Sequence, residues 1–268
     1  MPASKILVIT DSRGKGLEEL LETHTDPTLA INWTVRVYPG ATISAIHRRL
    51  NRLHSKYDAI IVIAGICNFT SRIKTRSTIH IEYTESKKDE TQIQIDALLD
   101  TFKEKVHLAT ITPADLFLQK FPNENTTTDA QKNLENDIKE VNNYIIGRNI
   151  HRDLPTVDLA DNSMTSSIKK QGSKKKRISK FCNSGLKFTN PKHTDGVHPN
   201  PALKEDWVKY IIKLAPHIIR RTSEVGATAQ EDPTSSEEDQ DPDWNDFKRN
   251  RNITGEHSGE GYPGSGSG

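Results

Sequence analysis

The segment Tyr57–Ala64 (YDAIIVIA) constrains the fold more than any other part of the sequence. Its apolar run is continuous rather than alternating, which is typical of a strand buried on both faces, as in a parallel sheet. Lys5–Thr10 and Val106–Thr112 are similar but shorter, and Ile31–Tyr38 alternates apolar and polar residues. The sequence therefore predicts a parallel sheet in which Tyr57–Ala64 is a central strand.

Amphipathic helices are predicted between these strands, because apolar residues recur at spacings of three and four. In Thr42–Ser55, for example, Ile43, Ile46 and Leu50 share one face. The predicted helices are Gly16–His24, Thr42–Ser55, Glu90–Lys105, Asp129–Arg148 and one that begins at Asn200-Pro201. With a short fifth strand at Thr156–Leu159, this alternation predicts an α/β fold: a three-layer α/β/α sandwich around a parallel, flavodoxin-like five-stranded sheet.

The distribution of charge divides the chain into two parts. Its 268 residues include 37 Lys and Arg and 36 Asp and Glu, a formal net charge of +1. Residues 222–268, however, hold 11 acidic and 3 basic residues, which leaves +9 for residues 1–221. The C-terminal part is rich in Ser, Asp, Glu, Pro and Gly and cannot bury enough apolar surface to offset its loss of conformational entropy. We predict one folded domain over residues 1–221 and a disordered, acidic low-complexity tail over residues 222–268.

A basic insertion is predicted inside this domain, at about residues 165–190. Seven of the twelve residues from Lys169 to Lys180 are Lys or Arg. Like charges at this density repel one another, which predicts an exposed loop. The residues proposed to contact a polyanion are Lys169, Lys170, Lys174, Lys175, Lys176 and Arg177. Such a loop is a candidate nuclear-import signal or a weak contact for nucleic acid or another polyanion, and it is equally explained as a solvated insertion without a partner.

Several classes of protein are excluded by what the sequence lacks. Cys67 and Cys182 are too few for a disulfide framework, and the longest apolar run, Ala59–Ile66, is too short to cross a bilayer. The N-terminus does not follow the pattern of a secretory signal, so we expect an intracellular protein, cytoplasmic or nuclear. The scattered histidines do not have zinc-site spacing and no phosphate-binding P-loop is present, so no metal or other cofactor is predicted.

The candidate chemistry lies directly after the predicted strands. Ligands of parallel α/β sheets bind beyond the carboxyl ends of the strands, where such residues meet. They are Asp11-Ser12 after the first strand, Gly40 after the second, Gly65-Ile66-Cys67-Asn68 after the third, and Asp195-Gly196-Val197-His198 before the last helix. Each has an ordinary structural explanation on its own, such as a helix cap or a turn. The combination and its order are far more specific.

In this order and spacing the four blocks resemble the SGNH (GDSL-type) hydrolase family of esterases and lipases, of which the chain would be a divergent member. The resemblance extends over about residues 5–220. It implies that Ser12 is the nucleophile, His198 the base and Asp195 the acid that orients the imidazole. It also implies hydrolysis of a small carboxylic ester through an acyl-enzyme. The oxyanion hole would include the N–H groups of Ser12 and Gly40.

Two positions depart from the family pattern. The family reads Gly-x-Asn-Asp after the third strand, so Cys67 stands where an Asn side chain is the third oxyanion-hole donor. A thiol is a much poorer donor than an amide, and Asn68 is the alternative donor if the loop is reshaped. Thr10 replaces the Gly before Asp11-Ser12, and its branched side chain restricts the turn. Two functions therefore stay open: a serine esterase, or a catalytically weak or inactive module, of mobile-element origin, that binds protein or nucleic acid.

Overall fold

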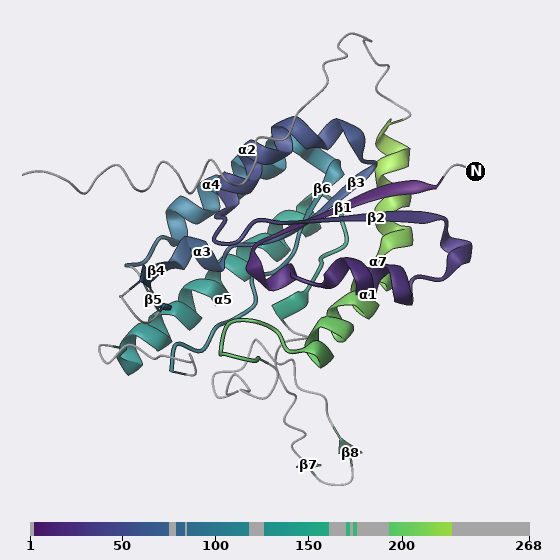
Figure 1. The fold of residues 1–268 in the computed structure, drawn as a ribbon. Coiled ribbons are helices and arrows are strands. Elements are labelled where there is room, and N and C mark those ends of the chain that lie inside the picture. Colours follow the sequence, from purple (N-terminus) through teal and green to yellow (C-terminus); the bar gives the residue numbers. More distant parts are fainter. Residues whose placement is uncertain are drawn as a thin grey trace, which may run out of the picture. The chain divides into compact units, whose positions relative to one another are not determined.

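A parallel sheet of four strands lies at the centre of the described structure (Figure 1). The computed structural model describes residues 3–74, 79–83, 85–117, 126–160, 170–171, 174–175 and 193–226. The strands are β1 (Ser4–Thr10), β2 (Ile31–Val37), β3 (Ala59–Ile63) and β6 (Val106–Leu108), in the order β2-β1-β3-β6. All neighbouring pairs are parallel, and the segment predicted to be central, now β3, is an inner strand.

The predicted fifth strand is reduced to one residue pair. Val157 forms a parallel bridge with Ala109, next to β6, so the flavodoxin-like order continues although the fifth ladder does not form. The Tyr210 hydroxyl contacts the backbone on either side of Val157: it donates to the carbonyl of Thr156 (3.0 Å) and accepts from the N–H of Asp158 (3.5 Å). Since the carbonyl of Val157 itself accepts from the N–H of Thr110, next to β6, the Tyr210 hydroxyl takes up the backbone groups on the outer side, away from β6.

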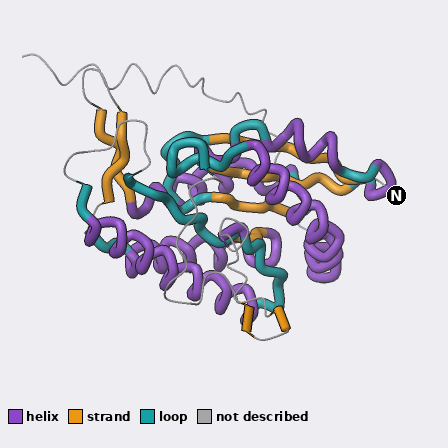
Figure 2. Tube along the Cα trace, turned by 90° about the horizontal axis from the view of Figure 1, so that it is seen from below, coloured by secondary structure: helices purple, strands orange, loops and turns teal. Residues whose placement is uncertain are grey.

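Helices cover both faces of the sheet, which gives the predicted three layers (Figure 2). On one face, residues such as Leu7 and Ile60 pack against three helices. On the other, residues such as Ile6 and Ile61 pack against two. The first set is α2 (Ile43–Leu53), α4 (Lys88–Phe102) and α5 (Thr128–His151), and the second is α1 (Leu17–His24) and α7 (Pro201–Gly226). Burial on both faces explains why the β3 sequence is apolar throughout.

A short helix and a hairpin follow β3, in a region for which the sequence predicted no regular structure. The helix is α3 (Ile66–Phe69), and the antiparallel hairpin consists of β4 (Thr70–Lys74) and β5 (Ile79–Tyr83). At the end of the hairpin the Tyr83 hydroxyl donates a hydrogen bond to Asp137 of α5 (2.7 Å). The hairpin is thus attached to α5 rather than to the sheet.

Two sequence predictions fall wholly or largely outside the described residues. Of the basic insertion, the description covers only β7 (Lys170–Gln171) and β8 (Lys174–Lys175), which pair antiparallel, and it does not extend to their side chains. Of the predicted tail, it covers only the end of α7, which continues to Gly226, past the predicted boundary at residue 221. No helix among the described residues is long and apolar enough to span a bilayer.

Two buried amide side chains of α5 hold the segment that follows β6. Asn142 accepts a hydrogen bond from the N–H of Ile111 (2.6 Å) and donates one to its carbonyl (2.8 Å). Gln131 accepts from the N–H of Leu116 (2.9 Å) and donates to the carbonyl of Ala114 (3.0 Å). These side chains replace the strand partner that the segment lacks, so its backbone polar groups can be buried.

Replacing Asn142 with Leu should destabilise the protein, because the N–H and the carbonyl of Ile111 would lose their partners. Each unsatisfied buried group costs about 1–3 kcal/mol. Urea unfolding measures the loss in the free energy of unfolding. The control is Asn143→Leu at the exposed neighbouring position, for which this free energy should change by no more than about 0.5 kcal/mol. Equal stability of the two variants would contradict the proposed role of Asn142.

Candidate active site

The predicted nucleophile lies in a tight turn at the carboxyl end of β1. After Thr10 the chain enters a 3-10 turn, Ser12–Gly14, and then reaches α1. Asp11 caps this turn by accepting a hydrogen bond from the N–H of Arg13 (2.9 Å). The turn thus lifts Ser12 beyond the end of the strand, at the edge of the sheet where ligands of α/β proteins bind.

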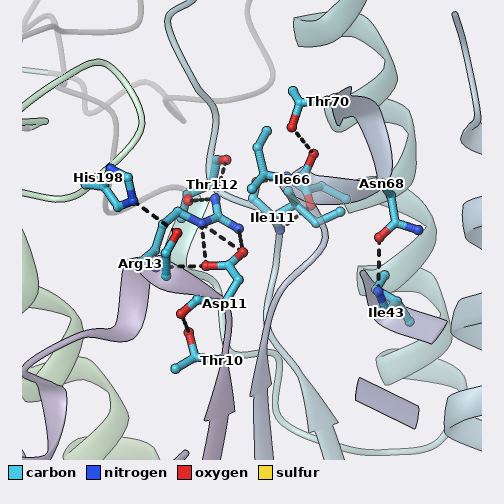
Figure 3. A network of polar contacts seen from close by, with 12 residues as sticks. Thr10, Asp11, Arg13, Ile43, Ile66, Asn68, Thr70, Ile111, Thr112 and His198 are labelled. Carbon is cyan, nitrogen blue, oxygen red and sulfur yellow. Dashed lines mark hydrogen bonds and ion pairs between the residues drawn. The ribbon is translucent and has the colours of Figure 1, made fainter. Parts of the chain in front are cut away.

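Ser12, His198 and Asp195 form one chain of hydrogen bonds. The Ser12 Oγ lies 3.0 Å from the His198 Nε2, and the His198 Nδ1 lies 2.8 Å from the Asp195 Oδ2. Figure 3 shows the His198 ring directed at the turn that carries Ser12. Both distances are within the range over which a proton can be exchanged between a nucleophile and a general base. The structure therefore brings the three predicted residues together.

The environment of Asp195 determines which ring nitrogen of His198 carries a proton. Partial burial raises the pKa of Asp195. Hydrogen bonds from the backbone and the ring of His198 and from the N–H of Val197 lower this pKa, and together they outweigh burial, so that the pKa lies below its ordinary value. Asp195 is therefore ionised at neutral pH and can only accept hydrogen bonds. The Nδ1 of His198 must then be the donor, which leaves Nε2 free to accept the proton of Ser12.

The loop that carries Asp195 and His198 is fixed at both ends. Before the loop, His193 pairs with Pro199 in an antiparallel bridge, and the N–H of Thr194 donates to the carbonyl of His198 (2.8 Å). After it, Asn200 caps α7 by accepting from the N–H of Leu203 (2.9 Å), as the sequence predicted.

The same loop is also connected to the segment after β6. The N–H of Asp115 donates to the carbonyl of Gly196 (2.8 Å). Gly196 has φ +76°, a conformation that glycine adopts without strain, and this lets the chain turn back from Asp195 to His198.

Gly40 lies in an exposed turn after β2, beside the end of β1. The N–H of Tyr38 donates to the carbonyl of Thr10 (2.7 Å), and the N–H of Ala41 closes the turn on the carbonyl of Tyr38 (3.0 Å). Gly40 itself has φ +77°. Among the described residues, none accepts a hydrogen bond from the N–H of Ser12 or of Gly40. Both predicted backbone donors are thus available to a ligand.

Cys67 and Asn68 differ in their relation to the site. Burial raises the pKa of the Cys67 thiol to about 12; the Asp11 carboxylate also raises it, and Arg13 partly opposes this. Cys67 is therefore a neutral thiol close to the Asp11–Arg13 pair rather than a thiolate nucleophile. The amide of Asn68 accepts from the N–H of Ile43 (3.0 Å) and donates to Gln94 (2.9 Å), so it is not available to replace the missing oxyanion donor. In Figure 3 it lies beside Ile43, apart from His198.

A buried ion pair beneath Ser12 was not predicted from the sequence. Arg13 is 1% exposed and Asp11 is fully buried. The guanidinium donates to both carboxylate oxygens of Asp11, through Nε to Oδ1 and through Nη2 to Oδ2, while Nη1 donates to the carbonyl of Thr112 (3.0 Å) and to its hydroxyl. Figure 3 shows this network between the ends of β1 and β6. An Arg next to a turn serine ordinarily indicates an exposed side chain, and no sequence signal distinguishes this one.

Thr10 stands where the family has Gly, and its side chain fits because residue 14 is a glycine without a side chain. A Cβ on Gly14 would lie 2.1 Å from the Thr10 Cγ2, far inside van der Waals contact. The Thr10 side chain thus occupies the space over Gly14, and the turn keeps its shape. Within the described residues, no group of three or more His, Cys, Asp or Glu side chains is arranged to hold a metal ion.

Replacing Arg13 with Met should destabilise the fold by about 3–5 kcal/mol, because it leaves the Asp11 carboxylate buried without a partner. The control is Arg148→Met, which breaks ion pairs with the more exposed Asp96 and Asp100 and should cost about 1 kcal/mol or less. Adding Asp11→Asn to Arg13→Met should recover part of the stability in thermal or urea unfolding. Equal losses for the two single variants would show that the Asp11–Arg13 pair is not important for stability.

Known proteins resemble this chain in structure rather than in sequence. No family model and no curated protein matches the sequence. A GDSL-like lipase from Bacteroides thetaiotaomicron is 17% identical, with a TM-score of 0.50 over 79% of this chain and 89% of that one. An acetyl xylan esterase is 15% identical (TM-score 0.50; 78% and 98%), and a putative GDSL-like lipase from Parabacteroides merdae is 12% identical (TM-score 0.51; 80% and 96%). Despite this low identity, the chain has the α/β/α fold of the GDSL-like lipases and esterases, as its motifs predicted.

Proposed function

We propose that the protein is a serine esterase that hydrolyses a carboxylic ester through an acyl-enzyme on Ser12. The observation that supports the proposal most strongly is the chain of contacts from the Ser12 Oγ to the His198 Nε2 (3.0 Å) and from the His198 Nδ1 to Asp195 (2.8 Å). A serine hydroxyl is a weak nucleophile until a base takes its proton, and this arrangement supplies an oriented base. The fold shared with GDSL-like lipases and an acetyl xylan esterase agrees with this chemistry.

In the acylation step, His198 Nε2 takes the proton of Ser12 as Oγ attacks the carbonyl carbon of the ester. The ionised Asp195 stabilises the imidazolium that forms. When the tetrahedral intermediate collapses, the bond to the alcohol oxygen breaks and His198 gives its proton to the leaving alcohol. A water molecule, deprotonated by the same Nε2, then attacks the acyl-enzyme, and the proton returns to Ser12 as the acid leaves.

The oxyanion hole is the weakest part of the proposed site. The N–H groups of Ser12 and Gly40 would stabilise the negative oxygen, and the start of the Ser12–Gly14 turn presents the first of them. The third donor would be the neutral thiol of Cys67. Loss of one such donor typically lowers kcat by about 10²–10³. We therefore propose a slow esterase rather than an inactive one.

The site is open to solvent, and this affects how large its substrate can be. The side chain of His198 is 42% exposed and that of Asp195 is 38% exposed. A triad this accessible can take a small ester or an ester group carried on a larger molecule. The similar structures include both lipases and an acetyl xylan esterase, so they do not select one acyl group.

Replacing Ser12 with Ala should lower the turnover of p-nitrophenyl acetate at least about a thousandfold, because the nucleophile is removed. Labelling by a fluorophosphonate probe should disappear in the same variant. Ser55→Ala, at an exposed serine, is the matched control and should behave as wild type. Absence of Ser12-dependent turnover and labelling in the wild-type protein would refute the esterase proposal and favour the binding module.

Replacing Cys67 with Asn should raise kcat by about 10-fold or more with little change in KM, because an amide would replace a poor donor where the oxyanion forms. Cys67→Ala is the control and should change kcat by a few-fold at most. Steady-state kinetics measure both, and thermal unfolding checks that the variants fold. If Asn and Ala at position 67 gave the same kcat, Cys67 would not be the third oxyanion-hole position.

A further inference from the structure

A long acid-free stretch of sequence lies next to the candidate active site. Residues 31–57 contain five Arg and Lys residues and not one Asp or Glu, in a chain with nearly equal numbers of acidic and basic residues. The stretch comprises β2, the turn that holds Gly40, and α2 with the turn that follows it. Its basic residues are Arg36, Arg48, Arg49, Arg52 and Lys56.

Four of these side chains fall on one surface, which we call the basic strip: Arg36, Arg49, Arg52 and Lys56. Arg49, Arg52 and Lys56 recur at spacings of three and four, the spacing that places residues on one side of a helix. The side they share is turned toward the end of β2, because the Arg49 guanidinium lies 3.9 Å from the centre of the ring of Tyr38, the residue after that strand. Among the described residues β2 is the edge strand of the sheet, so none of them adds a further strand on this side.

Arg36 extends the basic strip onto the sheet edge. It is paired in register with Ile9, and side chains at paired positions of parallel strands lie on the same face. Ile9 packs in the cluster that contains Ile43 and Ile46 of α2, so Arg36 lies on the face of the sheet that α2 covers. Its side chain is exposed at the edge.

The charges of the basic strip are not neutralised by the described part of the protein. None of its four side chains has a carboxylate partner within the described residues. On α4, which packs against α2, Asp96 and Asp100 are already bound by Arg148 of α5. The basic strip therefore retains its attraction for an external anion.

We propose that the basic strip binds the phosphodiester backbone of a nucleic acid. Its helical part extends over about 10 Å, from Arg49 to Lys56, which suits a row of phosphates better than one small anion. Three of its four cations are Arg, whose planar guanidinium matches phosphate oxygens. A membrane surface fits less well, because the apolar residues of α2 (Ile43, Ile46 and Leu50) are fully buried and cannot enter a bilayer.

Binding at the basic strip is independent of ester hydrolysis. It uses none of the triad. Arg49 of the strip contacts Tyr38, two residues before Gly40, so a bound strand would pass close to the candidate active site. It also differs from the contact predicted for the basic insertion, which lies elsewhere in the sequence.

The test measures the binding of the full chain to fluorescent 20-nucleotide single strands of RNA and of DNA by anisotropy, between 50 and 200 mM salt. The triple variant Arg49→Gln/Arg52→Gln/Lys56→Gln should lose at least about tenfold in affinity at low salt. The slope of log K against log salt is negative, and in this variant it should become shallower by about 2, since each contact to a single strand contributes about 0.7. The matched control, Lys132→Gln/Lys209→Gln/Lys213→Gln, removes three exposed charges elsewhere and should lose less than about threefold.

Further binding measurements separate a phosphodiester ligand from other polyanions and from a membrane surface. RNA and DNA should bind within about threefold of each other, and Ser12→Ala should bind both as wild type does, whether or not the esterase proposal holds. Equal losses in the two triple variants, or none in either, would overturn the proposal. It would also be overturned by binding of only one of the two nucleic acids, or by polyglutamate or vesicles of anionic lipid competing as well as an unlabelled oligonucleotide.

Discussion

The buried ion pair between Asp11 and Arg13 is the interaction on which the rest of the site depends. Taking two charges out of water is costly, so such a pair persists only where nearly every polar atom finds a partner. Here the Nη1 of Arg13 also donates hydrogen bonds to Thr112, and Asp11 also caps the turn that carries Ser12. One interaction thus shapes the turn that carries Ser12 and ties the end of β1 to the segment after β6.

The remaining parts of the site are linked to this pair through that same segment. Asn142 and Gln131 hold it against α5, and Asp115 connects it to Gly196 in the loop of Asp195 and His198. Ser12 and His198, which lie on different loops, are therefore positioned by one shared piece of backbone. The esterase proposal requires such rigidity, because a small displacement of a general base lowers its efficiency.

The sequence predicts the backbone better than it predicts the polar contacts. Buried strands such as β3 can be recognised because continuous apolar runs follow from burial on both faces, and Asn200-Pro201 marks a helix start by local chemistry alone. The fifth strand was overestimated: only Val157 pairs beside β6, and the distant hydroxyl of Tyr210 takes up the backbone groups on its outer side. The hydrogen bonds of Arg13 and Asn68 could not be predicted either, because their partners are set by the tertiary fold and the residue types alone give no indication of them.

The contact between Ser12 and His198 joins residues 186 positions apart in the chain. During synthesis the turn that carries Ser12 is made long before His198, which directly precedes α7. In the proposed mechanism, Ser12 has no base to take its proton until α7 docks on the sheet. A chain interrupted before Asp195 would retain the hydroxyl without the imidazole, so the segment that leads into the last helix completes the proposed site as well as the fold.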